Sequence, residues 1–499
     1  MNLNFWLPVL MLSSSFFTGL IIFFLKEEST RLRTALNLTG AVFKVVAVHY
    51  MAYRLLVLDH VHEASFTMGL GFDFVLRVDF LSLMFLALSS NLWLVTTVYA
   101  VGYLEGSPNR SRFFGFFSLC VTACTGIALA GNLVTFFIFY EFLTLTTYPL
   151  VVHRETRSAL QAGRTYLWYT ILGGTLLFVG VVWVQVIAGP LDFVDTGTLE
   201  ALKDDYHFTL CIIFSILIIG LGVKAALVPL HAWLPVAMVA PAPVSALLHA
   251  VAVVKAGAFG IIRVVFDLFG RDFAGLLGLL TPLAIIASIT IIYGSIQALA
   301  QTDLKKRLAY STVSQISYIT LGAAVIAPFS TVGAIVHLVH QGVMKVTLFF
   351  CAGNFAETLG IHDIPDLKGI ARRMPLTAAM FTLAAFGMIG IPPMAGFISK
   401  WYLGIGALDS GSEWVLAVLI ISSLLNSAYF LPIVYSMWFE PSDKEFRTIR
   451  PSRLEAPWML LVPPIFTAGA SLLAGLFANW NWSPLGLARQ IAFGMGVYP

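Results

Sequence analysis

Five ionisable side chains lie inside stretches of this sequence that are otherwise apolar enough to cross a membrane. They are one carboxylate and four amines: Glu141, Lys224, Lys255, Lys345 and Lys400. Placing an ionisable group in the hydrocarbon of a bilayer costs about 2.5–3.5 kcal/mol or more, so such groups usually face a water-filled path or a charged partner. The five residues therefore predict a path for charge through the interior of the protein.

Glu141, in FFIFYEFLTLTTYPL, is the one carboxylate near the middle of an apolar stretch. A lone buried carboxylate would stay protonated, whereas a nearby lysine would allow both groups to ionise. We expect Glu141 and Lys224 to form such a pair and to take part in charge movement. A purely structural ion pair, or a neutral glutamic acid, is the alternative.

Lys255 and Lys345 lie too deep in their apolar stretches to reach either surface comfortably. Burial favours the neutral form of an amine, so a lysine in this position can bind and release protons at working pH. His337 and Gln341 precede Lys345 at intervals of four and form one polar stripe on a helix. His249 precedes Lys255 by six and lies on a different helix face.

A purely structural role is the alternative for each of these residues. Carbonyls and hydroxyls of a static core could satisfy the two lysines. For His249, His337 and His340 a structural role is as good an interpretation as a functional one.

Two apolar stretches are interrupted by proline and glycine, in GLGVKAALVPLHAWLPVAMVAPAPV and FGMIGIPPMAGFISKWYLG. Proline removes a backbone donor and clashes one turn back, so the helices should break at these prolines: Pro229, Pro235, Pro392 and Pro393. Broken helix at membrane depth is tolerated only where protein or a water-filled cavity covers the loose backbone.

A lysine accompanies each break, Lys224 before the first and Lys400 after the second. The breaks are therefore candidates for half-channels that open to opposite sides of the membrane. A lysine that snorkels to the surface is the alternative for Lys400. His231, beside the first break, either lines an access route or caps it.

The composition excludes an ordinary soluble enzyme, because 59% of the 499 residues are hydrophobic and only 11% are charged. Such a sequence describes an all-α polytopic membrane protein. Cys120 and Cys124 share a helix face, but no further ligand completes a metal site. We find no nucleotide motif, metal site, haem ligands or catalytic constellation, so we expect no cofactor in this chain; whether it serves a translocase or oxidoreductase complex stays open.

Hydropathy predicts about 14 spans. We place them near 5–25, 34–58, 78–102, 112–131, 133–152, 165–189, 208–229, 241–266, 274–299, 308–327, 332–356, 375–408, 413–438 and 456–478. Outside the spans, most lysines and arginines fall in alternate loops, and the other side holds only Arg77, Lys203, Arg271 and Arg489. This asymmetry predicts an even number of spans with both termini on the outer side.

The two broken spans lie five spans apart, which predicts two five-helix repeats of opposite orientation, spans 4–8 and 9–13. We accordingly expect an N-terminal three-helix segment at 1–111, a first repeat at 112–268, a second repeat at 269–438, and a C-terminal helix with a short tail at 439–499.

Four segments together resemble the antiporter-like subunits of respiratory complex I, Mrp-type cation/proton antiporters and energy-converting membrane hydrogenases. They are YEFLTLTTYPL at 140–150, GVKAALVPLHAWLPVAMVAPAPVSALLHAVAVVKAG at 222–257, TDLKKRLAYSTVSQISY at 302–318 and GIPPMAGFISKWYL at 390–403. The resemblance extends over nearly the whole chain from about residue 75.

The resemblance implies roles for individual residues. Glu141 and Lys224 would be the coupling pair, Lys255 and Lys345 the central relay, and Lys400 the site in span 12. His249 and His337 match family histidines. Some members carry a second histidine where this sequence has Gln341, which can orient water but cannot titrate. The sequence also stops soon after span 14, which favours the D-type Mrp subunit or its hydrogenase counterpart over the terminal complex I subunit.

From these features we expect a subunit that moves protons, with sodium as an alternative ion, through a relay of buried side chains and water. Its partners would be other membrane subunits and the bilayer, with no nucleic acid. We expect it in a prokaryotic cytoplasmic membrane. A self-sufficient secondary transporter of a small solute is the alternative, since such transporters also use inverted repeats.

Overall fold

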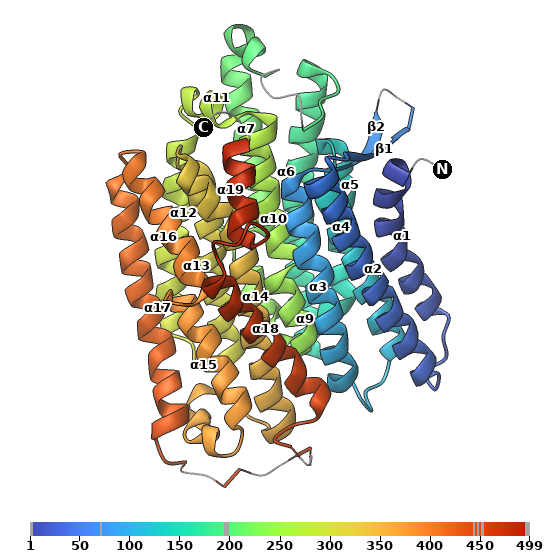
Figure 1. The fold of residues 1–499 in the computed structure, drawn as a ribbon, viewed down its shortest axis with the longest axis vertical. Coiled ribbons are helices and arrows are strands. Elements are labelled where there is room, and N and C mark those ends of the chain that lie inside the picture. Colours follow the sequence, from blue (N-terminus) through green and yellow to red (C-terminus); the bar gives the residue numbers. More distant parts are fainter. Residues whose placement is uncertain are drawn as a thin grey trace. The chain divides into compact units, whose positions relative to one another are not determined.

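The computed structural model of the protein describes residues 3–69, 72–193, 199–442, 445–446, 449–450 and 454–494. Within these residues the regular structure is helical apart from one two-stranded hairpin (Figure 1). The chain divides into two compact units, each built from segments that are not consecutive in sequence. The first unit comprises Met1–Leu94, Ser107–Trp233 and Val251–Ala284; the second comprises Val95–Gly106, Leu234–Ala250 and Ile285–Pro499.

The first unit is centred on α4, whose residues are nearly all buried and which packs against α1, α2 and α5. Its elements are α1 (Leu3–Phe23), α2 (Thr30–Leu58), β1 (His62–Thr67), β2 (Asp73–Val78), most of α3 (Phe80–Tyr103), α4 (Arg110–Leu129), α5 (Leu133–Val151), α6 (Arg157–Ala188), η1 (Glu200–Leu202), α7 (Lys203–Lys224), α10 (Val253–Arg263), η3 (Val264–Leu268) and α11 (Arg271–Leu276).

Side-chain caps fix where several of these helices begin. Asn132 accepts a hydrogen bond from the backbone of Thr135 at the start of α5. The Glu27 carboxylate caps α4 by accepting from the backbone N–H groups of Arg110 and Ser111, at 3.0 and 2.9 Å. Partial burial raises the pKa of Glu27, but these backbone bonds outweigh burial and hold the pKa below its usual value.

The hairpin of β1 and β2 lies between the spans expected at 34–58 and 78–102, and the prediction from the sequence did not include it. The strands are antiparallel, with His62 opposite Val78 and Thr67 opposite Asp73. On β2, Arg77 donates to Glu63 at 2.7 Å and to Asp192 at 3.1 Å.

The second unit is centred on α14, which is 32 residues long and mostly buried. It packs against α9 and α13, which precede it in the chain, and against α15, α16, α18 and α19, which follow it (Figure 1). The elements of this unit are α8 (Trp233–Val236), η2 (Ala237–Val239), α9 (Ala242–Ala250), most of α12 (Leu280–Leu299), α13 (Leu304–Ala324), α14 (Pro328–Leu359), η4 (Ile364–Leu367), η5 (Ile370–Arg372), α15 (Pro375–Ile389), α16 (Ala395–Asp409), α17 (Glu413–Phe439), α18 (Trp458–Leu476) and α19 (Pro484–Gly494).

Twelve helical segments in the described residues are long and apolar enough to cross a membrane. The span expected at 308–327 corresponds to α13, which is more polar, and the span expected at 375–408 corresponds to two shorter helices, α15 and α16. The protein is a mostly helical polytopic membrane protein.

Helical structure is interrupted at three places that concern the predicted path. α7 ends at Lys224 and α8 starts at Trp233, with Pro229 between them and Pro235 inside α8; α15 ends at Ile389, before Pro392 and Pro393, and α16 starts at Ala395. The third interruption lies between Ala250 and Val253, inside the span expected as one helix at 241–266. Neither proline nor glycine marks this third interruption in the sequence, so the hydropathy pattern could not reveal it.

Candidate functional site

In the first unit, Glu141 on α5 and Lys224 at the end of α7 form an ion pair. The carboxylate oxygen Oε1 lies 3.9 Å from the amine Nζ. The amine also donates to the backbone carbonyl of Tyr140 and lies 3.4 Å from the centre of the Tyr140 ring. The lysine side chain is 1% exposed and the glutamate 29%, so the pair has one buried and one accessible member.

A glycine on α6 makes room for the carboxylate. A Cβ atom at Gly174 would lie 2.4 Å from Glu141 Oε1 and 2.7 Å from its carboxyl carbon, far inside contact distance. Since α6 packs against both α5 and α7, any side chain at this position would displace the glutamate. The lack of a side chain at Gly174 is thus a requirement of the observed pair.

The end of α7 is closed by backbone bonds, and this closure fixes Lys224 beside the interruption. Ala226 adopts a left-handed conformation with φ of 55°. Its N–H bonds to the carbonyl of Val223, and the next N–H, of Leu227, bonds to the carbonyl of Gly222. This is the Schellman arrangement, built here on alanine where glycine is usual. Trp233 adds a bond from its ring nitrogen to the Val223 carbonyl at 2.8 Å.

Lys255 is the third residue of α10 and is completely buried. Within the part of the chain that the structure describes, its amine has no hydrogen-bond partner. α10 packs so closely on the end of α7 that a Cβ atom at Gly257 would lie 2.2 Å from the backbone nitrogen of Ala225. The helix that carries Lys255 therefore contacts the turn that follows Lys224.

In the second unit, Lys345 lies near the middle of α14 and contacts α13. Its amine donates to Ser311 Oγ at 2.7 Å and to the carbonyl of Leu308 at 3.2 Å. Ser311 Oγ lies 2.8 Å from the hydroxyl of Tyr429 on α17. Lys345 is fully buried and forms no ion pair within the described residues. Its positive charge would be solvated by these oxygen dipoles and by the ring of Phe430, whose centre lies 5.8 Å from the amine.

Lys400 on α16 reaches back to the helix that precedes the break. Its amine donates to the last carbonyls of α15, those of Met388 at 3.0 Å and Ile389 at 2.8 Å, and to Ser423 Oγ at 3.1 Å. The carboxyl end of a helix carries partial negative charge, so the interruption itself creates a site for the cation.

The predicted histidines and Gln341 occupy different surroundings. His337 is paired through Nδ1 with Ser399 Oγ at 2.8 Å and stacks on the Tyr318 ring. His249, on α9, is buried with its ring 4.6 Å from that of Phe349. Gln341 is buried, and neither end of its amide has a hydrogen-bond partner among the residues described. Of the polar stripe on α14, His337 and Lys345 therefore have hydrogen-bond partners, whereas Gln341 has none among the described residues.

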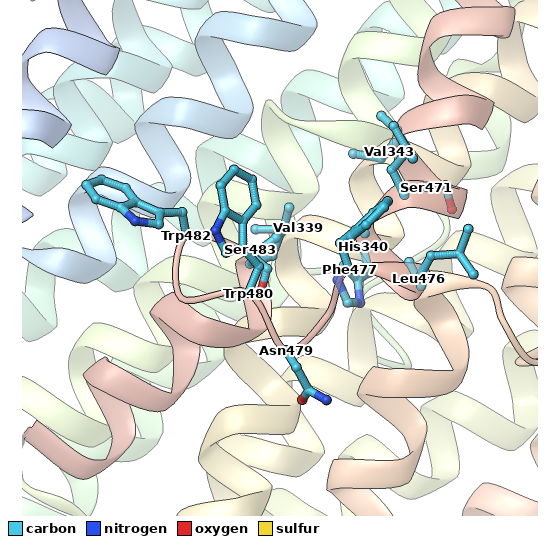
Figure 2. Close-up of a pocket in the computed structure, with 15 residues that line it drawn as sticks. Val339, His340, Val343, Ser471, Leu476, Phe477, Asn479, Trp480, Trp482 and Ser483 are labelled. Atoms are coloured by element: carbon cyan, nitrogen blue, oxygen red, sulfur yellow. The ribbon is translucent and has the colours of Figure 1, made fainter.

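His340, whose role the sequence left open, lines a pocket of about 860 Å³. The other walls come from α16, α18, the start of α19 and the turn before it, and include Phe477, Trp480 and Trp482. Figure 2 shows His340 beside Phe477, with the two tryptophan side chains further along the pocket. The lining is apolar apart from His340 and a few small polar side chains, so this pocket differs in character from the lysine sites.

Two protein families match this sequence. Residues 130–426 match the family described as NADH:quinone oxidoreductase/Mrp antiporter, transmembrane. Residues 66–114 match the family described as NADH-ubiquinone oxidoreductase (complex I), chain 5 N-terminus. The first match alone covers more than half of the chain. The chain belongs to this antiporter-like family.

Individual members of the family match along most of their length. The N-type subunit of the NADH-quinone oxidoreductase of Desulforudis audaxviator is 36% identical over 397 residues, which cover 77% of this chain and 78% of the relative. The D-type subunit of a Na(+)/H(+) antiporter of Bacillus subtilis is 28% identical over 421 residues, 83% of each chain. A chain in the structure of the Mrp complex from a Dietzia species superimposes with a TM-score of 0.86 over 99% of this chain and 98% of that chain, at 23% identity, which shows a shared fold.

The predicted resemblance to this family is therefore confirmed. The expected similarity to the D-type Mrp subunit agrees with the match to the Bacillus antiporter protein, which covers equal shares of both chains. The roles of the individual site residues stay predictions.

Several buried polar residues received no role in the prediction from the sequence. Asn426 and Tyr429, three residues apart in the apolar α17, lie on one helix face and are fully buried. Lys44, in the span expected at 34–58, donates at 2.7 Å to both Ser15 and Thr125. The signal for each was a polar residue in an apolar helix.

Arg263, in the span expected at 241–266, received no role in the prediction from the sequence. It forms ion pairs of 2.6 Å with Asp79 and Asp267, all within the first unit. The cluster includes Asp267, which lies one residue beyond the span expected at 241–266 and for which no role was predicted. Both carboxylates contact the same guanidinium, and we assign the cluster to the framework of the unit.

Proposed function

We propose that this chain is an ion-translocating subunit of a membrane complex, and that protons move through it by way of its buried lysines and Glu141. The observation that carries the proposal is the position of three amines at places where helical structure ends or restarts. Lys224 closes α7, Lys255 follows the start of α10, and Lys400 bonds to the open end of α15. An amine held by carbonyl and hydroxyl oxygens can gain and lose a proton without a rearrangement of the fold.

The finer organisation belongs to the same proposal. Fourteen membrane crossings would result if α13 and the α15–α16 pair also cross, and an even number agrees with both termini on the outer side. The two five-helix repeats and the domain boundaries at 111, 268 and 438 remain predictions. The lysine-rich loops would face the cytoplasm of a prokaryotic cell.

The subunit needs an energy source outside its own chain. Moving one charge against a membrane potential of 150 mV costs about 3–4 kcal/mol. Among the described residues there is no group of three or more potential metal ligands that could hold a redox metal. Its relatives are named as subunits of a quinone oxidoreductase and of a sodium/proton antiporter. We propose that a redox reaction in a partner subunit, or exchange against sodium, drives proton movement here.

The alternative, a self-sufficient transporter of a small solute, would need a roomy site lined by hydrogen-bonding groups near the broken helices. The pocket beside His340 is large, but its walls are mostly aliphatic and aromatic. The amines instead occupy separate positions on α7, α10, α14 and α16. A relay fits that distribution better than a solute pocket.

Lys255→Met and Lys345→Met test the proposal, because methionine keeps the length of the stem and deletes the titrating amine. In vesicles that contain the purified complex, each change should abolish or strongly reduce proton movement while the complex still assembles. Lys203→Met, at the start of α7 away from the buried sites, is the matched control and should leave transport unchanged. Equal losses at all three positions would contradict the proposal, since the assay would then report stability.

A further inference from the structure

A continuous series of hydrogen bonds joins Lys345 to Lys400 within the second unit. Lys345 Nζ lies 2.7 Å from Ser311 Oγ, Ser311 Oγ lies 2.8 Å from the hydroxyl of Tyr429, and that hydroxyl lies 2.6 Å from the side-chain amide of Asn426. The far end of the amide lies 3.2 Å from Lys400 Nζ. We call this series the Lys345–Lys400 link. Its three middle members are fully buried.

Exchange of the oxygen and nitrogen of the Asn426 amide gives two orientations with different partners, of which the exchanged one satisfies both ends of the amide. In one, the hydroxyl of Tyr429 donates to the amide oxygen, and the nitrogen donates to the carbonyl of Met388 at 3.3 Å. This orientation places the nitrogen 2.8 Å from Gln315 Nε2, so it requires the amide of Gln315 to exchange its oxygen and nitrogen as well. In the other, the nitrogen donates to the Tyr429 hydroxyl, and the oxygen accepts from Lys400 at 3.2 Å and from Gln315 at 2.8 Å. An amide donates through its nitrogen and accepts through its oxygen. When one end of the Asn426 amide donates toward Tyr429, the other end therefore accepts from the side of Lys400, and the reverse.

Each orientation suits a different charge state. A charged lysine only donates, whereas a neutral amine can also accept. If Lys345 is charged, it donates to Ser311, Ser311 to Tyr429, and Tyr429 to the oxygen of Asn426. The amide nitrogen then faces Lys400, which must be neutral to accept from it.

The reverse holds when Lys400 is charged. It donates to the amide oxygen, so the amide nitrogen donates to Tyr429, Tyr429 to Ser311, and Ser311 to a neutral Lys345. Two charged lysines would conflict with this order, because Ser311 or Tyr429 would then accept from both of its neighbours and its own hydroxyl hydrogen would have no acceptor within the link. No described carboxylate lies within ion-pair distance of either amine to relieve that conflict.

We propose that Asn426 is a positioning residue that makes the charged states of Lys345 and Lys400 alternate, by reversing the direction of the hydrogen bonds in the Lys345–Lys400 link. The inference rests on the proposed function and deepens it. No proton crosses the amide, because a carboxamide gives up an N–H proton far less readily than an ammonium does. Each lysine gains and loses its proton on its own side, and the link favours the protonation of one lysine while the other is neutral.

The test follows the charge of Lys400 by its reactivity. Acetic anhydride acylates only the neutral form of an amine, and Lys400 borders a pocket of about 560 Å³ that admits a small reagent. Peptide mass spectrometry of the intact complex, briefly labelled, gives the acylation rate at Lys400, with exposed Lys306 as the internal standard. This measurement does not depend on transport, so it can fail or succeed separately from the proposed function.

The decisive comparison is Lys345→Met in two backgrounds. With Asn426 present, removing the charge at 345 should leave Lys400 charged and lower its acylation rate about five-fold or more, the usual lower range for coupled sites. In protein that carries Asn426→Leu, Lys345→Met should leave the rate unchanged. Tyr429→Phe keeps the aromatic ring, interrupts the link next to the amide, and should abolish the coupling in the same way if Asn426→Leu does not assemble.

Two results would overturn the proposal. An equal fall in acylation in both backgrounds would mean that the lysines repel one another directly and that Asn426 takes no part. No fall in either background would mean that the two lysines are not linked.

Discussion

Gly174 on α6 and Glu141 on α5 are so close that the glutamate carboxylate occupies the space where a side chain at 174 would begin. The relationship explains how an ionisable side chain finds room between helices packed as tightly as α5, α6 and α7. It also shows that the position of Glu141 beside Lys224 depends on a residue that cannot take part in any chemistry.

Gly174→Ala should therefore reduce proton movement while the complex remains folded. The new methyl group would push the flexible end of Glu141 away from Lys224. Alanine also favours helix over glycine by about 1 kcal/mol, which offsets part of the steric cost. Transport in vesicles and thermal unfolding of the same preparation would separate the two effects. Gly469→Ala, on α18 where a Cβ meets nothing within 4 Å, is the matched control and should change neither.

The pairing of Glu141 with Lys224 predicts a non-additive effect on stability. Lys224→Gln alone leaves a half-buried carboxylate without its partner, and Glu141→Gln alone leaves a buried amine without its partner. The double change Glu141→Gln with Lys224→Gln leaves no unpaired charge, so its unfolding temperature should be no lower than that of either single variant. Strictly additive losses would show that the two side chains do not interact, although they lie 3.9 Å apart.

A histidine outside the spans predicts how stability changes with acid. Burial, with a smaller contribution from nearby Arg112, lowers the pKa of His153 to about 4, whereas an unfolded histidine titrates near 6.5. Between these values the unfolded chain binds the proton more readily, so the stability due to this group is full above about pH 6.5 and is lost as the pH falls toward 4. His153→Phe should reduce the loss of unfolding temperature between pH 7 and pH 5. The same change at exposed His207 should leave that loss as it is in the unaltered protein.

The sequence predicted the class of the fold and the family well, because long apolar stretches and the motif from residue 222 to 257 are local signals. It placed Lys224 and Lys400 beside interrupted helices because proline marks those positions. The interruption between Ala250 and Val253 escaped prediction, since its residues are as apolar as the helices on either side.

The hydropathy pattern could not predict contacts between residues that come together only when distant helices pack. Gly174 lies 33 positions from Glu141 in the sequence, and Asn426 lies 26 positions from Lys400. The members of each pair lie on different helices, so their spacing in the sequence does not indicate that they are in contact. Ser311 and Tyr429 look like ordinary polar substitutions in apolar helices until α13, α14 and α17 come together. Such contacts depend on packing between distant helices, which hydropathy does not encode.

Glu141→Gln tests the central claim most directly, because it conserves shape and most hydrogen bonding and removes only the ability to titrate. The measurement is the rate of proton movement in vesicles that contain the purified complex, compared at equal amounts of assembled protein. We predict that movement is abolished or strongly reduced while assembly is normal. Normal proton movement with normal assembly would contradict the account, since Glu141 and Lys224 would then be a structural pair only.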